Sequence, residues 1–164
     1  MPIATRVLVL WLAVAAGCAS SNQEDDEALV VANRQEWAVT DIDGTRHDLS
    51  AELANGKSVA LVFWQTWCKA CLREAPELAA AARKHAGSVA FYGVVSGPDE
   101  YVDDGKVRTV AKKYSMPYPQ IRDRELELTH QFHVRGTPTI VVVRPDGRVA
   151  YTGHQPPESW IDPR

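Results

Sequence analysis

A pair of cysteines at the junction of an apolar segment and a helix-like segment constrains the fold of this chain more than any other feature. Cys68 and Cys71 follow the apolar run 58–64 and precede residues 72–85, which we predict to be helical. Two thiols at this spacing, where a strand passes into a helix, are typical of a redox-active dithiol. The first thiol lies where unpaired backbone N–H groups and the positive end of the helix dipole favour an anion. Because the thiolate is the reactive form, this position lowers the pKa of a thiol and raises its reactivity.

The length and charge of the chain restrict its class. Its 164 residues are typical of one domain, and its net charge is −3. Lysines and arginines are scattered along the sequence and form no basic block. We therefore expect no nucleic-acid partner.

The N-terminus has the pattern of an export signal. The apolar run 7–16 follows Arg6 and is too short to span a bilayer, which needs about 20 residues. The run ends in Ala15-Ala16-Gly17-Cys18, which resembles the lipobox of bacterial lipoproteins, in which the cysteine is lipidated. We predict a signal peptide over residues 1–17, lipidation at Cys18, a tether over 18–34 and the folded domain over 35–164. The protein would then be exported and anchored by its lipid on the periplasmic side of a membrane. The alternative is ordinary signal cleavage, with no role for Cys18.

The export hypothesis accounts for the three cysteines. If Cys18 carries a lipid, only Cys68 and Cys71 remain, and they can pair. In an oxidising compartment such a dithiol stays reduced only if electrons are supplied.

The hydrophobic pattern predicts an α/β sandwich with a mixed central sheet. The expected strands are residues 37–40, 45–49, 59–64, 89–96, 139–143 and 148–152. The expected helices are residues 50–54, with Ser50 as the N-cap, 74–85, 104–114 and 124–132.

Several motifs together resemble the TlpA/ResA-like thioredoxins, over residues 37–153. They are Phe63-Trp64 followed by Trp67-Cys-X-X-Cys71, Pro76, Gly136-Thr137-Pro138 and the hairpin turn 144–147. The resemblance implies a thioredoxin fold, in which helices flank a mixed sheet, and the activity of an exported thiol–disulfide oxidoreductase. It implies no cofactor other than a redox-active Cys68–Cys71 disulfide.

The dithiol and the proline motif suggest specific roles. Cys68, nearer the helix start, is expected to attack a substrate disulfide, and Cys71 then resolves the mixed disulfide. The resemblance implies a cis peptide bond at Pro138, next to the dithiol, and main-chain hydrogen bonds from Thr137 to the substrate. Trp67 would offer an apolar landing surface, although core packing is the alternative.

Glu74 is the candidate acid–base group. It lies three residues after Cys71 and therefore close to it on a helix. In the resembling reductases, a glutamate at this spacing assists proton transfer at the dithiol. The alternative is an acid that only stabilises the helix N-terminus.

The resemblance favours a reductant of protein disulfides that receives electrons from a membrane thiol transporter. Apocytochrome c, and hence cytochrome c maturation, is the commonest substrate it implies. A thiol oxidant or isomerase on the same fold is an alternative. A copper- or zinc-binding protein that uses Cys68, Cys71 and a histidine is another, although related copper chaperones have three residues between their cysteines. We assign no metal ligand.

The C-terminus departs from the family pattern, which ends with a helix on one face of the sheet. Residues 154–164 contain three prolines, so this helix is expected to be short or missing. Either the chain is truncated or another element covers that face, and we expect lower stability than in a full-length relative.

Overall fold

The computed structural model describes residues 37–161. The predicted signal peptide 1–17, Cys18 and the predicted tether 18–34 lie outside the described residues, as do residues 35–36 and 162–164. Within residues 37–161, every helix is too short or too polar to cross a membrane.

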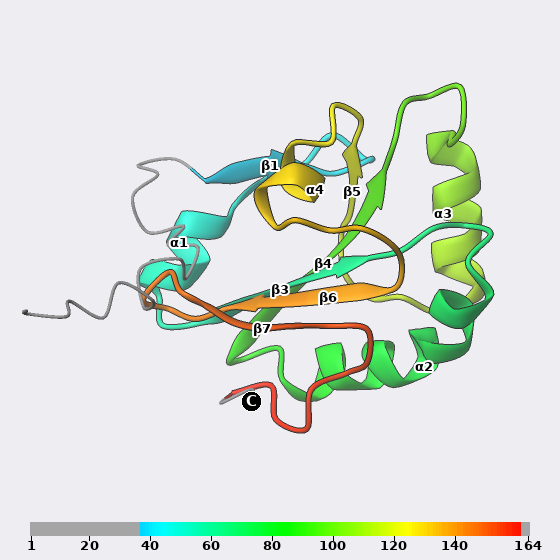
Figure 1. Ribbon diagram of the computed structural model, residues 1–164. Coiled ribbons are helices and arrows are strands. Elements are labelled where there is room, and N and C mark those ends of the chain that lie inside the picture. The colour runs from blue at the N-terminus through cyan, green and yellow to red at the C-terminus, as the bar shows by residue number, and fades with distance from the viewer. Residues whose placement is uncertain (1–36, 162–164) are drawn as a thin grey trace, which may run out of the picture.

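A five-stranded mixed sheet forms the centre of the molecule (Figure 1). Its strand order is β5-β4-β3-β6-β7, with β3, β4 and β5 parallel and with β6 and β7 each antiparallel to its neighbours. A hairpin of β1 and β2 lies beside it. The prediction of an α/β fold with a mixed sheet is therefore confirmed. In chain order the elements are β1 (Ala38–Thr40), β2 (Arg46–Asp48), α1 (Leu49–Ala54), β3 (Ser58–Phe63), α2 (Lys69–Lys84), β4 (Val89–Ser96), α3 (Asp104–Lys113), β5 (Gln120–Asp123), α4 (Glu127–Gln131), β6 (Thr139–Val143) and β7 (Val149–Gly153).

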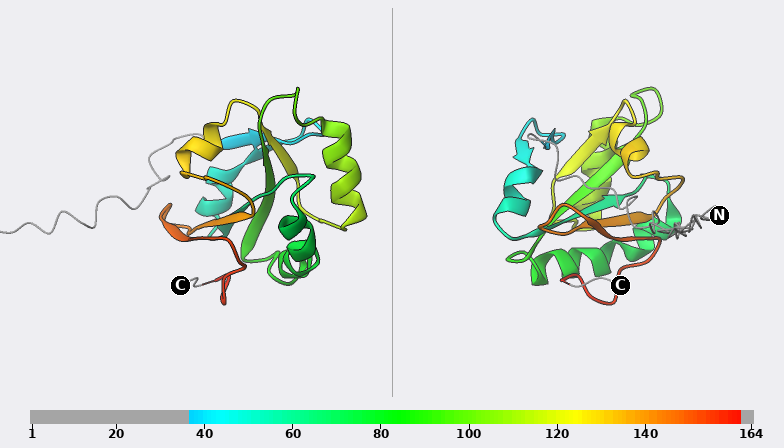
Figure 2. Two further views of the ribbon diagram at one scale, coloured as in Figure 1. Left: turned by 45° about the vertical axis from the view of Figure 1, so that its right-hand side comes forward. Right: turned by 60° about the vertical axis from the view of Figure 1, so that its left-hand side comes forward.

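The central strand β3 is buried on both faces, which explains its continuous apolar sequence. Val59, Leu61 and Phe63 pack in one cluster with residues of α1 and α4. Ala60 and Val62 point to the other face and pack in a second cluster with residues of α2. Figure 2 shows the resulting layers, with helices on both sides of the sheet.

A third cluster joins α3 to the end of the sheet where β3 passes into α2. Val107 and Ala111 of α3 are buried there together with Trp64 and Cys71. The second cysteine is therefore part of the core, at the C-terminal end of two parallel strands.

Three helices differ from the prediction at their first residues, and α1 differs least, since it starts at Leu49 rather than at residue 50. Helix α2 starts at Lys69 rather than at 72 or 74, because the Cys68 sulfur caps it by accepting a hydrogen bond from the backbone N–H of Cys71 at 3.1 Å. Helix α4 starts at Glu127 rather than at 124, because Leu126 has a left-handed backbone with φ 60°.

The predicted N-cap of α1 was wrong. Asp48 caps this helix by accepting a hydrogen bond from the N–H of Ala51 at 3.0 Å. The hydroxyl of Ser50 instead accepts one from the N–H of Trp37 at 2.8 Å, which ties the start of β1 to α1.

The segment after β7 packs on the α2 side of the sheet through one tryptophan. Residues 154–161 form no helix. Trp160 is instead buried in the α2-side cluster, with its ring 4.6 Å from that of Phe91. Within the described residues, a coil segment with one tryptophan therefore fills part of this face.

Candidate active site

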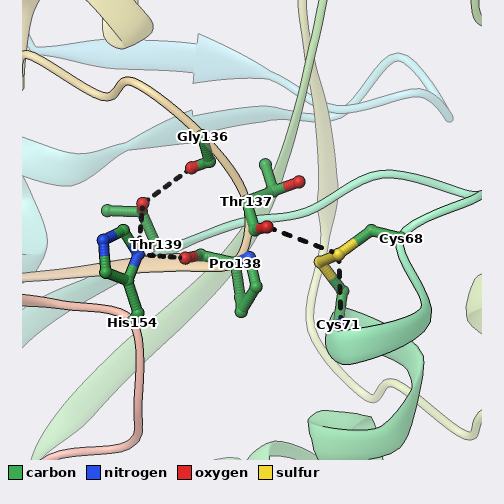
Figure 3. Close-up of a disulfide and its surroundings, with 7 residues drawn as sticks. All are labelled: Cys68, Cys71, Gly136, Thr137, Pro138, Thr139 and His154. Carbon is green, nitrogen blue, oxygen red and sulfur yellow. Dashed lines mark hydrogen bonds between the residues drawn. A yellow bond between two sulfur atoms is a disulfide. The ribbon is translucent and has the colours of Figure 1, made fainter.

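Cys68 and Cys71 form a disulfide in the first turn of α2 (Figure 3). Only 3% of Cys71 is exposed, whereas Cys68 lies partly at the surface. A thiolate or a disulfide arriving from solvent therefore meets Cys68 first. The N–H of Cys71, which points at the Cys68 sulfur, and the positive end of the α2 dipole both favour negative charge on that sulfur.

The Thr137–Pro138 peptide bond is cis, as expected, and it lies against the disulfide. The carbonyl oxygen of Thr137 is 3.6 Å from the sulfur of Cys68. In the disulfide this is a contact between heavy atoms, and it becomes a hydrogen bond when Cys68 carries a thiol proton. Pro138 and Cys71 also line one small apolar pocket. Segments 66 or more residues apart in the sequence therefore meet at one site.

The two tryptophans before the dithiol have different environments. Trp64 is buried and its ring N–H donates to the side-chain oxygen of Gln120 at 2.9 Å, so it is a core residue. Trp67 is 56% exposed next to Cys68. Trp67 therefore offers apolar surface beside the partly exposed sulfur, and the core-packing alternative does not describe it. Its role as a landing surface stays a prediction.

Glu74 lies one turn after Cys71 on α2 and is partly buried. Among the described residues, none forms a hydrogen bond with its buried Oε2. Burial raises the pKa of this carboxyl; the guanidinium of Arg73 opposes the rise and the carboxylate of Glu77 adds to it. A carboxyl whose pKa is shifted towards neutrality suits proton exchange with a neighbouring thiol, but that role stays a prediction.

Replacing Glu74 by glutamine should slow disulfide reduction by about ten- to a hundredfold. A general base usually contributes about a hundredfold or more, so this expected effect is a modest one. The reason is that the Cys71 thiol must lose a proton before it attacks the mixed disulfide, and glutamine accepts none. The measurement is the rate of insulin reduction between pH 5 and 8. The wild-type rate should fall on the acid side as the Glu74 carboxylate and the Cys68 thiolate are protonated, and the variant should keep only the part of this fall that is due to Cys68.

Glu77→Gln, an exposed position on the same helix, is the matched control and should keep the wild-type rate at neutral pH. Because the Glu77 carboxylate adds to the pKa rise of Glu74, the acid limb of this control should persist and move only slightly to lower pH. The pH dependence of the stability has the opposite sign to the pH dependence of the rate. Since the folded-state pKa of Glu74 is above the unfolded value, ionisation opposes folding, and the free energy of unfolding falls as pH rises through the folded pKa. Glu74→Gln should lack that fall. A variant that keeps both the rate and the acid limb contradicts a role for Glu74.

Sequence reasoning assigned no role to His154, which contacts the proline motif. Its Nδ1 lies 2.7 Å from the carbonyl oxygen of Pro138. The pairing of the last two strands produces this contact, because β7 ends at Gly153, opposite Ile140, and so brings residue 154 next to residue 139. A lone histidine after a strand carries no signal of such a contact in the sequence.

One hollow of the structure lies apart from the dithiol. This hollow of about 460 Å³ between β1, β5 and α4 has none of the predicted site residues in its lining.

Among residues 37–161, no three histidine, cysteine, aspartate or glutamate side chains lie close enough together to hold a metal ion.

Comparison with known proteins places the chain in a family. The family model named Redoxin matches residues 25–162. The chain belongs to the Redoxin family. Among curated relatives of this Redoxin-family protein, the thiol-disulfide oxidoreductase ResA of Geobacillus kaustophilus is 29% identical over 150 residues, which cover 88% of this chain and 82% of the relative. ResA of Bacillus subtilis is 30% identical over 115 residues, covering 69% of this chain and 60% of the relative.

Solved structures show the same fold. A secreted disulfide oxidoreductase of Mycobacterium tuberculosis, described as homologous to DsbE, matches with a TM-score of 0.62 at 25% identity, over 80% of this chain and 87% of that one. The fold is therefore thioredoxin-like, and this Redoxin-family protein is a thiol–disulfide oxidoreductase of the ResA type.

Proposed function

We propose that this protein reduces disulfide bonds of protein substrates outside the cytoplasm, with Cys68 as the attacking thiol and Cys71 as the resolving thiol. The difference in exposure between the two sulfurs carries this assignment, because a substrate disulfide reaches Cys68 and not Cys71. The neighbouring Thr137 carbonyl and the exposed Trp67 ring support binding of a substrate chain beside Cys68.

The proposed reaction has two exchange steps. The Cys68 thiolate attacks one sulfur of the substrate disulfide, so that a mixed disulfide forms and the other substrate sulfur leaves as a thiolate. Cys71 loses its proton, with Glu74 as the proposed acceptor, and attacks the Cys68 sulfur. The second substrate thiolate leaves and the Cys68–Cys71 disulfide forms. The substrate gains two electrons and two protons, and the dithiol of this protein is oxidised.

The proposal also covers location and electron supply. The export signal and lipidation at Cys18 predicted from residues 1–18 would tether the domain to the periplasmic side of a membrane. A membrane thiol donor would then return two electrons to the disulfide after each cycle. The similar disulfide oxidoreductase of Mycobacterium tuberculosis is secreted, which supports an extracytoplasmic location. Immature cytochrome c is one candidate substrate.

The direction of electron flow is tested by the reduction potential together with insulin reduction. The protein is equilibrated with dithiothreitol or glutathione buffers, and its Cys68–Cys71 pair is quantified by thiol trapping. A potential near that of thioredoxin, about −270 mV, together with faster insulin reduction than by dithiothreitol alone, is expected for a reductant. A potential near that of DsbA, about −120 mV, together with oxidation of reduced ribonuclease A, would instead identify a thiol oxidant.

A further inference from the structure

We propose that His154 is a positioning residue that holds the cis-proline segment, residues 136–139, in place for a protein substrate. The inference rests on the proposed function, since it concerns the surface on which that substrate would lie. Figure 3 shows this segment between the disulfide on one side and the His154 ring on the other. The ring acts on the site through the segment and does not touch the sulfurs in this view.

The hydrogen bond from His154 fixes which ring nitrogen carries a proton. A carbonyl oxygen only accepts, so the 2.7 Å contact with Pro138 requires a proton on Nδ1 of His154. The hydroxyl of Thr139 is 3.4 Å from the same nitrogen, which makes it a much weaker partner. The neutral ring is therefore the Nδ1–H tautomer, with Nε2 left as an acceptor.

The backbone around His154 is held firmly enough to aim the ring. The hydroxyl of Tyr151 donates to the carbonyl oxygen of Gln155 at 2.6 Å, and this bond spans the end of β7. The Tyr151 ring passes over Gly153 so closely that a Cβ at position 153 would overlap it. Since Gly153 pairs with Ile140, residue 154 is carried directly to the cis-proline segment.

Two side-chain hydrogen bonds therefore brace the cis-proline segment. The Thr139 hydroxyl donates to the carbonyl oxygen of Gly136 at 2.7 Å, and His154 holds the carbonyl of Pro138. Between them lies Thr137, whose carbonyl is next to Cys68. A substrate that binds along Thr137 needs its disulfide aligned with the Cys68 sulfur, and small misplacements of reacting groups cost large factors in rate. Loss of the His154 bond leaves the Thr139 hydroxyl as the only one of these two side-chain braces.

Three variants separate this role from a general structural one. His154→Ala removes the donor, His154→Asn returns an N–H near the position of Nδ1, and His154→Gln places one near the position of Nε2. We expect His154→Ala and His154→Gln to lower kcat/KM for insulin by about tenfold, mainly through KM, which corresponds to one hydrogen bond. His154→Asn should recover to within about threefold of the wild type. Kinetics with a range of insulin concentrations give these values, and thermal melts check folding.

The tautomer gives a test that needs no variant. The ¹⁵N chemical shifts of the His154 ring, at a pH where the ring is neutral, should show the proton on Nδ1. A proton on Nε2, His154→Ala with kcat/KM within twofold of the wild type, or folded His154→Asn no better than folded His154→Ala would overturn the proposal.

The two proposals can fail separately. If the wild type does not reduce insulin, the reductase function fails, and the same three variants are compared in oxidation of reduced ribonuclease A. We expect His154→Asn to rescue the activity and His154→Gln not to rescue it, for either direction of electron flow. If this difference is also absent in the ribonuclease A assay, the proposed role of His154 is overturned.

Discussion

Serine in place of Cys68 should reduce the rate of insulin reduction to that of dithiothreitol alone. Cys68 is the accessible sulfur, and the helix N-terminus that favours its thiolate cannot make a serine hydroxyl an equivalent nucleophile. The remaining thiol, Cys71, is 3% exposed and lies in a cluster with Trp64 and α3, where a protein disulfide cannot reach it. Insulin precipitation with dithiothreitol as the electron source measures the effect.

The matching variant, Cys71→Ser, should also lose turnover, but for a different reason. Its Cys68 still attacks, so a mixed disulfide forms and then persists because no resolving thiol lies beneath it. After incubation with oxidised insulin, mass spectrometry without reductant should detect the covalent adduct for Cys71→Ser and none for Cys68→Ser. Iodoacetamide should also alkylate the free thiol of Cys71→Ser faster than that of Cys68→Ser.

Both variants are best made together with Cys18→Ser, so that no other thiol is present. The Cys18→Ser protein with both active-site cysteines is the reference and should reduce insulin. Equal turnover by all three proteins would end the oxidoreductase assignment for this dithiol. An adduct on Cys68→Ser but not on Cys71→Ser would exchange the roles of the two sulfurs.

The bounds of the buried strands could be predicted almost to the residue because most of their side chains are apolar. The structure gives β4 and β6 the predicted bounds, and β3 differs by one residue at each end. In each strand nearly every residue lies in the core, so a continuous apolar run is enough to find it.

The strand β5 was missed because three of its four residues are polar and yet buried. Gln120 accepts from the Trp64 ring and donates to the carbonyl of Tyr118. Asp123 accepts from two backbone N–H groups at the start of α4 and from the Thr129 hydroxyl. Specific partners satisfy these polar groups, some close in the sequence and one, Trp64, far from Gln120, and a pattern of hydrophobicity contains no information on such pairing.

The active site was predictable where its chemistry resides in local motifs. The cysteine pair and the proline motif indicated a site even though 66 residues separate Cys71 from Thr137. The contact of His154 with Pro138 was not predictable, because it depends on the register between β6 and β7 and on the turn that follows Gly153. A residue that positions a motif from another segment of the chain has no recognisable sequence pattern of its own.

Arg122→Ala should lower the free energy of unfolding by about 3 to 4 kcal/mol, within the range for loss of one partner of a buried ion pair. The side chain of Arg122 is 1% exposed. Its guanidinium donates to the carbonyl oxygens of Val102 and Gly97, each at 2.7 Å, and to Asp104 at 2.7 Å. Alanine leaves the carbonyl oxygens of Val102 and Gly97 without this donor and leaves a cavity at the sheet edge.

The neighbouring Arg124 is a control that binds the same carboxylates at the surface. It contacts Asp99 at 2.8 Å and Asp104 at 2.9 Å, but its side chain is 42% exposed. Arg124→Ala should therefore cost less than about 1 kcal/mol, as is usual for exposed ion pairs. Urea unfolding of both variants gives the two values. The corresponding fall in Tm is about 10 to 15 °C for Arg122→Ala and a few degrees at most for Arg124→Ala.

The comparison separates burial from charge. If the ion pairs alone stabilised this region, both variants would lose similar amounts, because both arginines contact Asp99 and Asp104. We expect unequal losses because Arg122 also donates hydrogen bonds to the carbonyls of Gly97 and Val102, at the two ends of the loop 97–102. Val102 in turn packs in the same cluster as Cys71. Arg122→Lys should then recover only part of the stability, since one ammonium cannot reach carbonyls that the planar guanidinium binds simultaneously. Equal losses for Arg122→Ala and Arg124→Ala, or full recovery with lysine, would contradict this account.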